Sequence, residues 1–369
     1  MIEFSKYMKK NSFIDKTIQI IASLLIAFVR KLASFSWSKE PNLAVISFHK
    51  LGDTVFTIPS IKLLIKKYGN NIIIFCYPES KSIYELVLSG IKYQVVKKEE
   101  FKIGGRIASR KVRKLLKKIN PSTIVDFTGS ITSASLIFNS KAKVIVGFNK
   151  VYFRKIYSSY ISKRTKPHLI DMYLEVVGLL FPLTNIELDK EYQVKIFERA
   201  PVLIYPFAGS RAKEWNINKY IELGKIINES YNCSFIDNNL LNNESKQELI
   251  DNNIFVYQSE TIDDLISILK KCSLLISNDS GPIHIASILN KPTFTIYGPT
   301  NPVFHIPYGK YHGMIQKKIE CSPAPDKKYC YTRGGLYCPA YECMNQLSLE
   351  EVKNSVLQFI NEIGIKTNK

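Results

Sequence analysis

The feature that most constrains the fold of this chain is a repeated alternation of short apolar runs with helix-like segments. Such alternation is typical of βαβ units, in which parallel strands are joined by helices. In the first half we expect a helix after residue 53, with a kink or late start at Pro59. The other elements expected there are strands at 43–48, 71–77, 93–96, 123–127 and 143–147 and helices at 82–88, 106–118 and 133–138.

The alternation restarts after a polar, proline-containing stretch near residues 182–200. We expect strands at 202–205, 233–236, 254–256, 274–277 and 293–297 and helices at 218–229, 262–270 and 282–289. Two successive arrays predict an α/β fold of two Rossmann-like domains, residues 41–185 and 186–345, facing a central cleft. A basic amphipathic segment, residues 1–40, precedes them, and a C-terminal helix, residues 346–369, follows.

The charge of the chain is concentrated in its first half. The 369 residues carry a formal net charge of +19. Residues 1–170 contain 31 Lys and Arg against 9 Asp and Glu, and the remainder contains 20 against 23. This asymmetry favours a negatively charged partner, such as nucleic acid, an anionic membrane or a phosphorylated substrate. The alternative is that the lysine-rich usage reflects coding bias.

An uncharged, mostly apolar stretch covers residues 17–29. A spanning helix needs roughly 20 such residues, so this stretch is too short to cross a bilayer. Flanking lysines fit a helix that lies on an anionic membrane surface. The alternative is a helix packed on the protein body. We therefore expect a cytoplasmic protein. If the helix lies on the membrane surface, we expect the protein to attach peripherally to the inner membrane.

Several catalytic motifs are absent from the sequence. It contains no G-x-G-x-x-G after the first strand, no G-x-x-x-x-G-K-[ST], no H-E-x-x-H and no G-x-S-x-G. These absences argue against dehydrogenase, P-loop, zincin and α/β-hydrolase functions. No aromatic-interleaved nucleic-acid motif is present either, so we expect no nucleic-acid partner.

Three strand-to-helix turns carry residues suited to chemistry. The first contains Gly52 and Asp53, where a carboxylate could take a proton from an incoming hydroxyl or could cap the helix. The second, residues 206–215, offers small residues with Ser210, Arg211 and Lys213 for an oxyanion. The alternative interpretation of this second turn is a solvated loop in which Trp215 packs against the next helix.

The third turn is suited to a diphosphate. It contains Asp279, Ser280 and Gly281 at a helix N-terminus, with Pro282 placed like a first-turn proline. His284 follows within the first turn, where we favour a functional over a structural role. The segment 297–302 ends the next strand and could border the same pocket.

Four of the seven cysteines cluster near the C-terminus, at Cys321, Cys330, Cys338 and Cys343. Four thiolates could hold zinc or iron, but no C-x-x-C pair is present, and we favour free thiols or facultative disulfides. An odd number of cysteines without a cleavable signal favours a reducing compartment.

Three strings in this chain resemble the bacterial heptosyltransferases of glycosyltransferase family 9. They are Leu51-Gly52-Asp53-Thr54 with Pro59, Asp126-Phe127-Thr128-Gly129-Ser130 with Ser133, and the long string from Asn278 through Lys291-Pro292 to Pro302. The resemblance runs in order over about residues 43–352. Thr128 stands where the family often has Gln, and the basic segment of residues 1–40 is an addition.

The resemblance implies a GT-B fold and an inverting transferase that needs no metal or other cofactor. It assigns Asp53 as the general base and Lys213 as the positive charge that acts on the donor diphosphate. It also assigns the nucleotide-sugar loop to Asp279, Ser280, Gly281 and His284. Ser210, Arg211 and Pro282 join the expected donor site; Lys50, Gly52 and Asp126 are the expected acceptor contacts.

The implied donor is ADP-L-glycero-D-manno-heptose, and the implied acceptor is the phosphorylated inner core of lipopolysaccharide. One alternative is an autotransporter protein heptosyltransferase with a cysteine-bound metal. Another is a non-catalytic basic protein that binds nucleic acid or anionic lipid.

Overall fold

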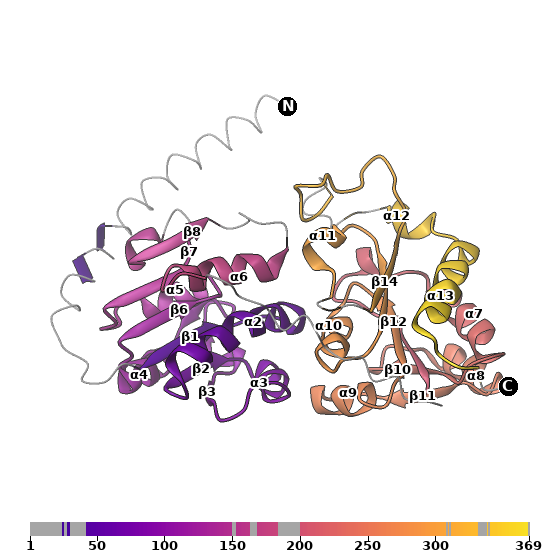
Figure 1. Ribbon diagram of the computed structural model, residues 1–369, viewed down its shortest axis with the longest axis horizontal. Coiled ribbons are helices and arrows are strands. Elements are labelled where there is room, and N and C mark those ends of the chain that lie inside the picture. The colour runs from indigo at the N-terminus through magenta and orange to yellow at the C-terminus, as the bar shows by residue number, and fades with distance from the viewer. Residues whose placement is uncertain are drawn as a thin grey trace. The chain divides into compact units, whose positions relative to one another are not determined.

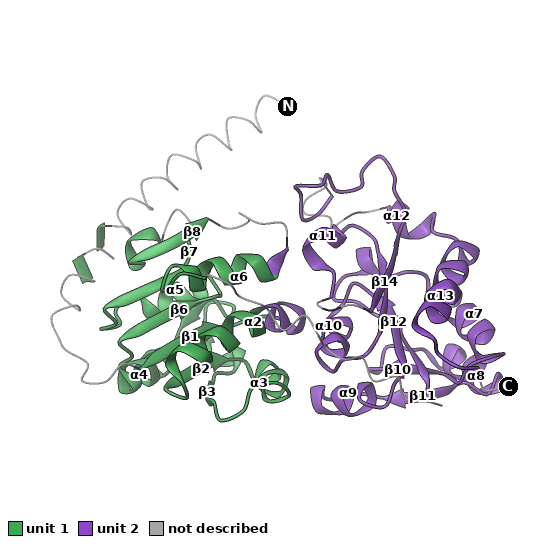
Figure 2. Cartoon of the chain, viewed as in Figure 1, with its two compact units in different colours: residues 1–49, 57–166, 170–186 green, residues 50–56, 167–169, 187–369 purple. Residues whose placement is uncertain are grey.

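The computed structural model describes residues 24–25, 28–29, 42–149, 153–162, 168–183, 200–307, 309, 311–330, 338 and 340–367. The chain divides into two compact units, coloured separately in Figure 2. The first comprises residues 1–49, 57–166 and 170–186, and the second comprises residues 50–56, 167–169 and 187–369. Helix α2 (Leu51–Tyr68) is therefore shared, because its first residues are counted with the second unit.

The expected basic segment of residues 1–40 lies outside the described residues, apart from four positions. In the part of the chain that is described, no helix combines the length and the hydrophobicity required to span a bilayer.

The first unit is built on a six-stranded parallel sheet (Figure 1). Its spatial order is β3-β2-β1-β6-β7-β8, which is the strand order of a Rossmann fold. The strands are β1 (Leu43–Ser47), β2 (Ile72–Cys76), β3 (Lys92–Val95), β6 (Thr123–Asp126), β7 (Val144–Asn149) and β8 (Ser159–Ser162). All five residues of β1 are buried, because helices cover both faces of a parallel sheet, so its sequence is continuously apolar.

The helices of the first unit differ in places from the expectation. They are α2, α3 (Pro78–Glu85), α4 (Arg110–Ile119), α5 (Ile131–Ile137) and α6 (Leu169–Gly178). Helix α2 runs on through Pro59, whereas α3 begins earlier than expected, with Pro78 at its start.

The expected helix at residues 106–118 is wrong at its N-terminal end. Strands β4 (Phe101–Lys102) and β5 (Ile107–Ala108) form a short antiparallel hairpin there, and α4 begins only after it. Gly104 and Gly105 take positive φ angles of 60° and 76°, which makes the tight reversal accessible to the backbone. Helical periodicity alone did not reveal this hairpin.

The second unit repeats the same architecture. Its parallel sheet has the order β11-β10-β9-β12-β13-β14, formed by β9 (Val202–Tyr205), β10 (Cys233–Asp237), β11 (Phe255–Gln258), β12 (Leu274–Asn278), β13 (Thr293–Tyr297) and β14 (His312–Gln316). The helices are α7 (Ile217–Asn228), α8 (Asn243–Asp251), α9 (Ile262–Leu269), α10 (Gly281–Ile288), α11 (Pro302–His305), α12 (Glu342–Asn345) and α13 (Leu349–Ile363). In Figure 1, α7, α8 and α13 lie on one side of this sheet and α9 and α10 on the other.

These two sheets confirm the predicted architecture of two Rossmann-like α/β domains. The strand order reverses between β1 and β6 in one sheet and between β9 and β12 in the other. In such sheets ligands bind beyond the carboxyl ends of the strands at the point of reversal. All three turns that the sequence singled out follow β1, β9 or β12, so the topology puts them at these points.

Candidate active site

One cavity in the second unit gathers most of the expected site residues. It has a volume of about 180 Å³. Its lining residues are Lys50, Gly52, Asp53, Phe56, Gly209, Ser210, Lys213, Asp279, Ser280, Gly281, His284, His305, Lys328 and Tyr329. All of them belong to the second unit, since that unit includes residues 50–56.

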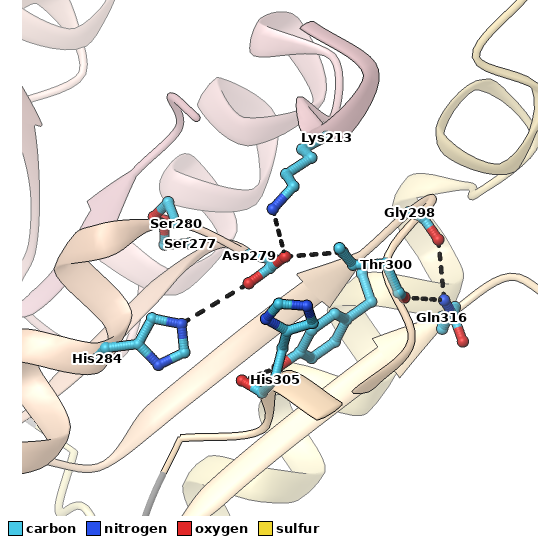
Figure 3. Close-up of polar contacts among 10 residues, drawn as sticks. Lys213, Ser277, Asp279, Ser280, His284, Gly298, Thr300, His305 and Gln316 are labelled. Carbon is cyan, nitrogen blue, oxygen red and sulfur yellow. Dashed lines mark hydrogen bonds and ion pairs between the residues drawn. The ribbon is translucent and has the colours of Figure 1, made fainter. Parts of the chain in front are cut away.

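The carboxylate of Asp279 is the centre of the polar contacts in this cavity (Figure 3). Its Oδ2 accepts hydrogen bonds from Lys213 Nζ at 2.6 Å and from Thr300 Oγ1 at 2.7 Å. Its Oδ1 lies 3.8 Å from Nε2 of His284. Three segments far apart in the sequence therefore meet on one buried side chain.

Electrostatics keep Asp279 ionised. Burial by itself would raise the pKa of this carboxyl, but the charge of Lys213, followed by the side-chain contact with His284, holds the pKa well below its ordinary value. An ionised Asp279 cannot donate a proton at neutral pH. It acts as a fixed anion that orients Lys213 and compensates much of the positive charge of that lysine.

The turns after β9 and β12 are tied together by the fully buried side chain of Asn278. Its Oδ1 accepts from the backbone N–H of Trp215 at 3.0 Å and from the hydroxyl of Tyr220 at 2.9 Å, while its Nδ2 donates to the carbonyl of Pro206 at 2.6 Å. Trp215 is buried in the core of this unit and so anchors the turn, as the alternative interpretation of that turn proposed. The same turn nonetheless supplies Gly209, Ser210 and Lys213 to the cavity.

The start of α2 packs against the start of α10 through two glycines. A Cβ atom on Gly52 would lie 2.9 Å from Cδ2 of His284, and one on Gly281 would lie 2.9 Å from Cβ of Leu51. Both glycines are needed because the two helix ends approach this closely. Asp53 is the third residue of α2, inside its first turn rather than ahead of the helix, and it faces the same cavity as Asp279.

Two buried histidines stand in the cavity wall with one ring nitrogen each unpaired. Among the described residues, Nδ1 of His284 and Nε2 of His305 have no hydrogen-bond partner. Both rings pack on Phe56, with centroid distances of 4.7 Å and 6.4 Å. Burial lowers the pKa of His305 to about 3, so its imidazole is neutral at physiological pH.

We expect His305 to make stability depend on pH. In the unfolded chain this histidine takes up a proton near its ordinary pKa of 6.5, whereas in the folded chain it stays neutral down to about pH 3. The free energy of unfolding should therefore fall as the pH drops below 6.5, by about 1.4 kcal/mol per pH unit.

Urea unfolding at pH 7 and pH 5 measures this effect, with His305→Gln as the comparison. The variant should lose about 2 kcal/mol less between the two pH values than the wild type does. An equal loss in both proteins would assign the pH dependence to other groups.

Most of the expected site residues meet in the cavity. The exceptions are Arg211, Pro282 and Asp126, which do not line it. Asp126 is fully buried in the first unit, where Oδ1 accepts from the N–H groups of Thr128 and Gly129 and Oδ2 accepts from Tyr157. Its carboxylate thus holds the turn after β6, and its direct contact with an acceptor stays a prediction.

Four lining residues lie outside the turns that the sequence singled out: Phe56, His305, Lys328 and Tyr329. Thr300, which bonds to Asp279, lies in the segment 297–302 that was expected to border the pocket. The side chain of Gln316 supports that segment by donating to the carbonyls of Gly298 and Thr300, both at 2.8 Å (Figure 3). No short motif marks Lys328 or Tyr329, because they come from an irregular loop.

The four clustered cysteines line a second, much smaller cavity of about 10 Å³. Burial raises the pKa of Cys343 to about 11 and that of Cys321 above its ordinary value, with smaller contributions from the neighbouring thiols. Within the described residues no group of three or more His, Cys, Asp or Glu is placed to hold a metal ion. All four are free cysteines in this structure.

A family model relates the chain to known proteins. The model of glycosyltransferase family 9 (heptosyltransferase) matches residues 109–332, more than half of the chain. The matched region includes Lys213, Asp279 and His284, whereas Asp53 lies before it.

Curated relatives are heptosyltransferases of moderate similarity. The lipopolysaccharide core heptosyltransferase OpsX of Haemophilus influenzae is 24% identical over 226 residues, which cover 55% of this chain and 64% of that protein. Lipopolysaccharide heptosyltransferase 2 of Escherichia coli is 30% identical over 149 residues, 35% of this chain and 41% of that protein. The chain thus spans less than two thirds of the length of these relatives.

Solved structures share the fold. E. coli ADP-heptose lipopolysaccharide heptosyltransferase II superposes with a TM-score of 0.64 at 18% identity, covering 87% of this chain and 99% of that one. The E. coli heptosyltransferase WaaC, solved with ADP, gives 0.61 at 14% identity, covering 87% and 97%. The iron-containing dodecameric glycosyltransferase TibC of E. coli gives 0.56 at 13% identity, covering 89% and 78%.

Proposed function

Because this chain belongs to glycosyltransferase family 9, the heptosyltransferase family, we propose that it transfers a heptose from ADP-L-glycero-D-manno-heptose to a phosphorylated lipopolysaccharide inner-core acceptor, with inversion. The observation that carries the proposal is the shared cavity of Asp53 and Asp279 with Lys213. It joins a carboxylate at a helix start to a lysine held by a buried anion. In a displacement at an anomeric carbon, the carboxylate can take the proton of the attacking hydroxyl and the lysine can stabilise the leaving diphosphate.

The donor half of the proposal rests on the turns after β9 and β12. One structural relative, WaaC, was solved with ADP. In this chain Lys213 and the turn of Ser280 and Gly281 offer a cation and a helix N-terminus to a diphosphate. Arg211 and Pro282 flank these turns without lining the cavity, so we give them no direct contact.

Asp53 would serve as the general base. The acceptor hydroxyl attacks the anomeric carbon on the face opposite the leaving ADP, and a proton passes from that hydroxyl to the Asp53 carboxylate. The carbon–oxygen bond to the diphosphate breaks in the same displacement. General-base assistance of this kind contributes on the order of 10²–10⁴ in rate.

Lys213 would stabilise the negative charge that grows on the departing diphosphate. Asp279 and Thr300 fix the position of this lysine before the substrate arrives, so little reorganisation is needed during the reaction. In the described part of the chain, Nδ1 of His284 and Nε2 of the neutral His305 ring have no hydrogen-bond partner. Hydroxyl groups of the sugar can form hydrogen bonds with these nitrogens. We assign no cofactor and no catalytic metal to the reaction.

The acceptor half of the proposal rests on charge. Residues 1–170 carry a large excess of Lys and Arg, which suits a phosphorylated core. Lys50 and Gly52, in the cavity, are the proposed acceptor contacts, and Asp126 supports the acceptor side through the turn that it holds. A membrane-embedded acceptor and a nucleotide-linked donor would meet at the cytoplasmic face of the inner membrane, where the basic N-terminal segment would assist.

A transfer assay tests the function. ADP-heptose is compared with UDP- and GDP-sugars, using truncated inner-core acceptors with and without their phosphates. We expect transfer only from ADP-heptose and only to a phosphorylated core. Transfer from another nucleotide sugar would overturn the donor assignment, and equal transfer to the dephosphorylated core would overturn the acceptor assignment.

The rival within the same family is a protein heptosyltransferase with a metal at the four cysteines. Transfer to an autotransporter polypeptide, together with stoichiometric iron or zinc in protein purified without chelator, would replace our acceptor assignment. A protein that binds RNA or anionic vesicles but neither transfers nor hydrolyses any nucleotide sugar would overturn the enzymatic proposal altogether.

A further inference from the structure

The cavity has a second wall that lies outside the expected donor loops. It is made by His305 at the end of α11 and by Lys328 and Tyr329 from the irregular segment between β14 and α12. The rings of His305 and Tyr329 lie 6.0 Å apart, and Nζ of Lys328 lies 5.4 Å from the centroid of the Tyr329 ring. These three side chains form one continuous surface of the cavity.

Asn301 makes several of the hydrogen bonds that hold the segment carrying this wall. Asn301 is buried, and its Nδ2 donates to the carbonyl oxygens of Ala324 (3.1 Å), Pro325 (3.2 Å) and Lys327 (2.9 Å). Its backbone N–H donates to the carbonyl of Lys328 at 3.0 Å. One residue thus fixes the backbone on both sides of the position from which Lys328 projects.

Further contacts hold the end of this segment against the strand that supports the donor site. The N–H of Cys330 donates to the carbonyl of Pro299 at 3.0 Å, and Tyr329 forms an antiparallel bridge with Thr300. The small cavity lined by the four cysteines also includes Gly298 and Pro299. The four cysteines therefore share one small cavity with the turn that precedes Thr300.

The cavity is lined by three lysines, Lys50, Lys213 and Lys328, and by two aspartates, Asp53 and Asp279. Asp279 lies 2.6 Å from Lys213 and compensates much of its charge before any ligand binds. The diphosphate of a nucleotide sugar carries about two negative charges and gains a further one when it leaves, so a second cation is needed near it. Lys328 adds positive charge to the same lining, and its charge also acts on His305.

We infer that Lys328 is a second cationic contact for the diphosphate of the donor nucleotide, presented by the segment that Asn301 fastens. This inference rests on the proposed function and names a donor-binding residue beyond Lys213. Asp279 orients Lys213 and compensates part of its positive charge. Lys328 would supply additional positive charge to the diphosphate. Together they would balance the diphosphate without a divalent cation.

Binding of ADP, measured by isothermal titration calorimetry, tests the inference. In Lys328→Ala the dissociation constant for ADP should rise about tenfold or more, because a charge-assisted contact is lost. Adenosine, which has no phosphate, should bind both proteins equally. Lys328→Arg should retain most of the affinity for ADP, and higher salt should narrow the difference between the wild type and Lys328→Ala.

Lys327→Ala is the matched control. Lys327 is the preceding residue in the same segment; its side chain is exposed and pairs with Asp326 at 2.9 Å, and only its backbone carbonyl meets Asn301. We expect its ADP affinity to match that of the wild type. Equal ADP affinities for Lys328→Ala and Lys327→Ala would overturn the inference.

The outcomes separate this inference from the proposed function. If the wild-type protein fails to bind ADP, the proposed function fails and the role of Lys328 fails with it. If the wild type binds ADP and Lys213→Ala weakens binding while Lys328→Ala does not, only the role of Lys328 is overturned.

Discussion

Replacing Asp53 by asparagine should lower the rate of heptose transfer by about 10²–10⁴-fold while leaving ADP affinity nearly unchanged. Asparagine keeps the size and shape of the side chain at the third position of α2 but cannot accept the proton of the acceptor hydroxyl. ADP affinity should survive because the proposed diphosphate contacts come from other turns, around Lys213 and Gly281.

Steady-state transfer kinetics and ADP titrations of the same preparation measure both quantities. Glu79→Gln is the matched control, since Glu79 is also an acidic residue in the first turn of a helix, α3, and does not line the cavity. Its transfer rate should equal that of the wild type. An Asp53→Asn rate above about a tenth of the wild-type rate would show that another group takes the proton.

Replacing Lys213 by alanine should weaken ADP binding and slow transfer together, the rate falling by about 10²–10³-fold. The loss should exceed that of one hydrogen bond because the variant leaves the buried carboxylate of Asp279 without its main cation. An uncompensated anion would then face the diphosphate. The repulsion between Asp279 and the diphosphate then adds to the loss of the attraction between Lys213 and the diphosphate.

A double-mutant cycle isolates this repulsion. Asp279→Asn retains an amide that can accept from Thr300 but removes the negative charge, so the double variant should bind ADP more tightly than Lys213→Ala alone. Lys225→Ala, at a surface lysine that pairs with Glu222 and Glu248, serves as the control and should behave as the wild type. Unaltered kinetics in Lys213→Ala would remove this lysine from the site.

Much of the candidate site could be predicted because the residues that carry it follow predictable strands. Apolar runs located β1, β9 and β12, and the rule that ligands bind at the carboxyl ends of central parallel strands directed attention to the turns after them. Asp53, Lys213 and Asp279 were found in this way. The hairpin before α4 was missed, because two adjacent glycines can reverse a chain whose flanking residues still have helical periodicity.

Roles within the site were harder to predict. Asp126 and Asp279 both lie at the carboxyl end of a central strand, yet one holds a turn through backbone N–H groups and a tyrosine, whereas the other orients a lysine in a cavity. A residue type at a strand end does not reveal which partners the neighbouring segments will bring. Both carboxylates are buried, and only their hydrogen-bond partners distinguish them.

The sequence by itself determined the two parallel sheets, the turns that bear chemistry and the surplus of positive charge. These depend on periodicity and composition, which are local properties of the chain. Only the tertiary structure decided that His305 and Lys328 line the cavity of Lys213 and Asp279. Their convergence depends on strand register and on the hydrogen bonds of Asn301, which are long-range contacts that no local pattern encodes.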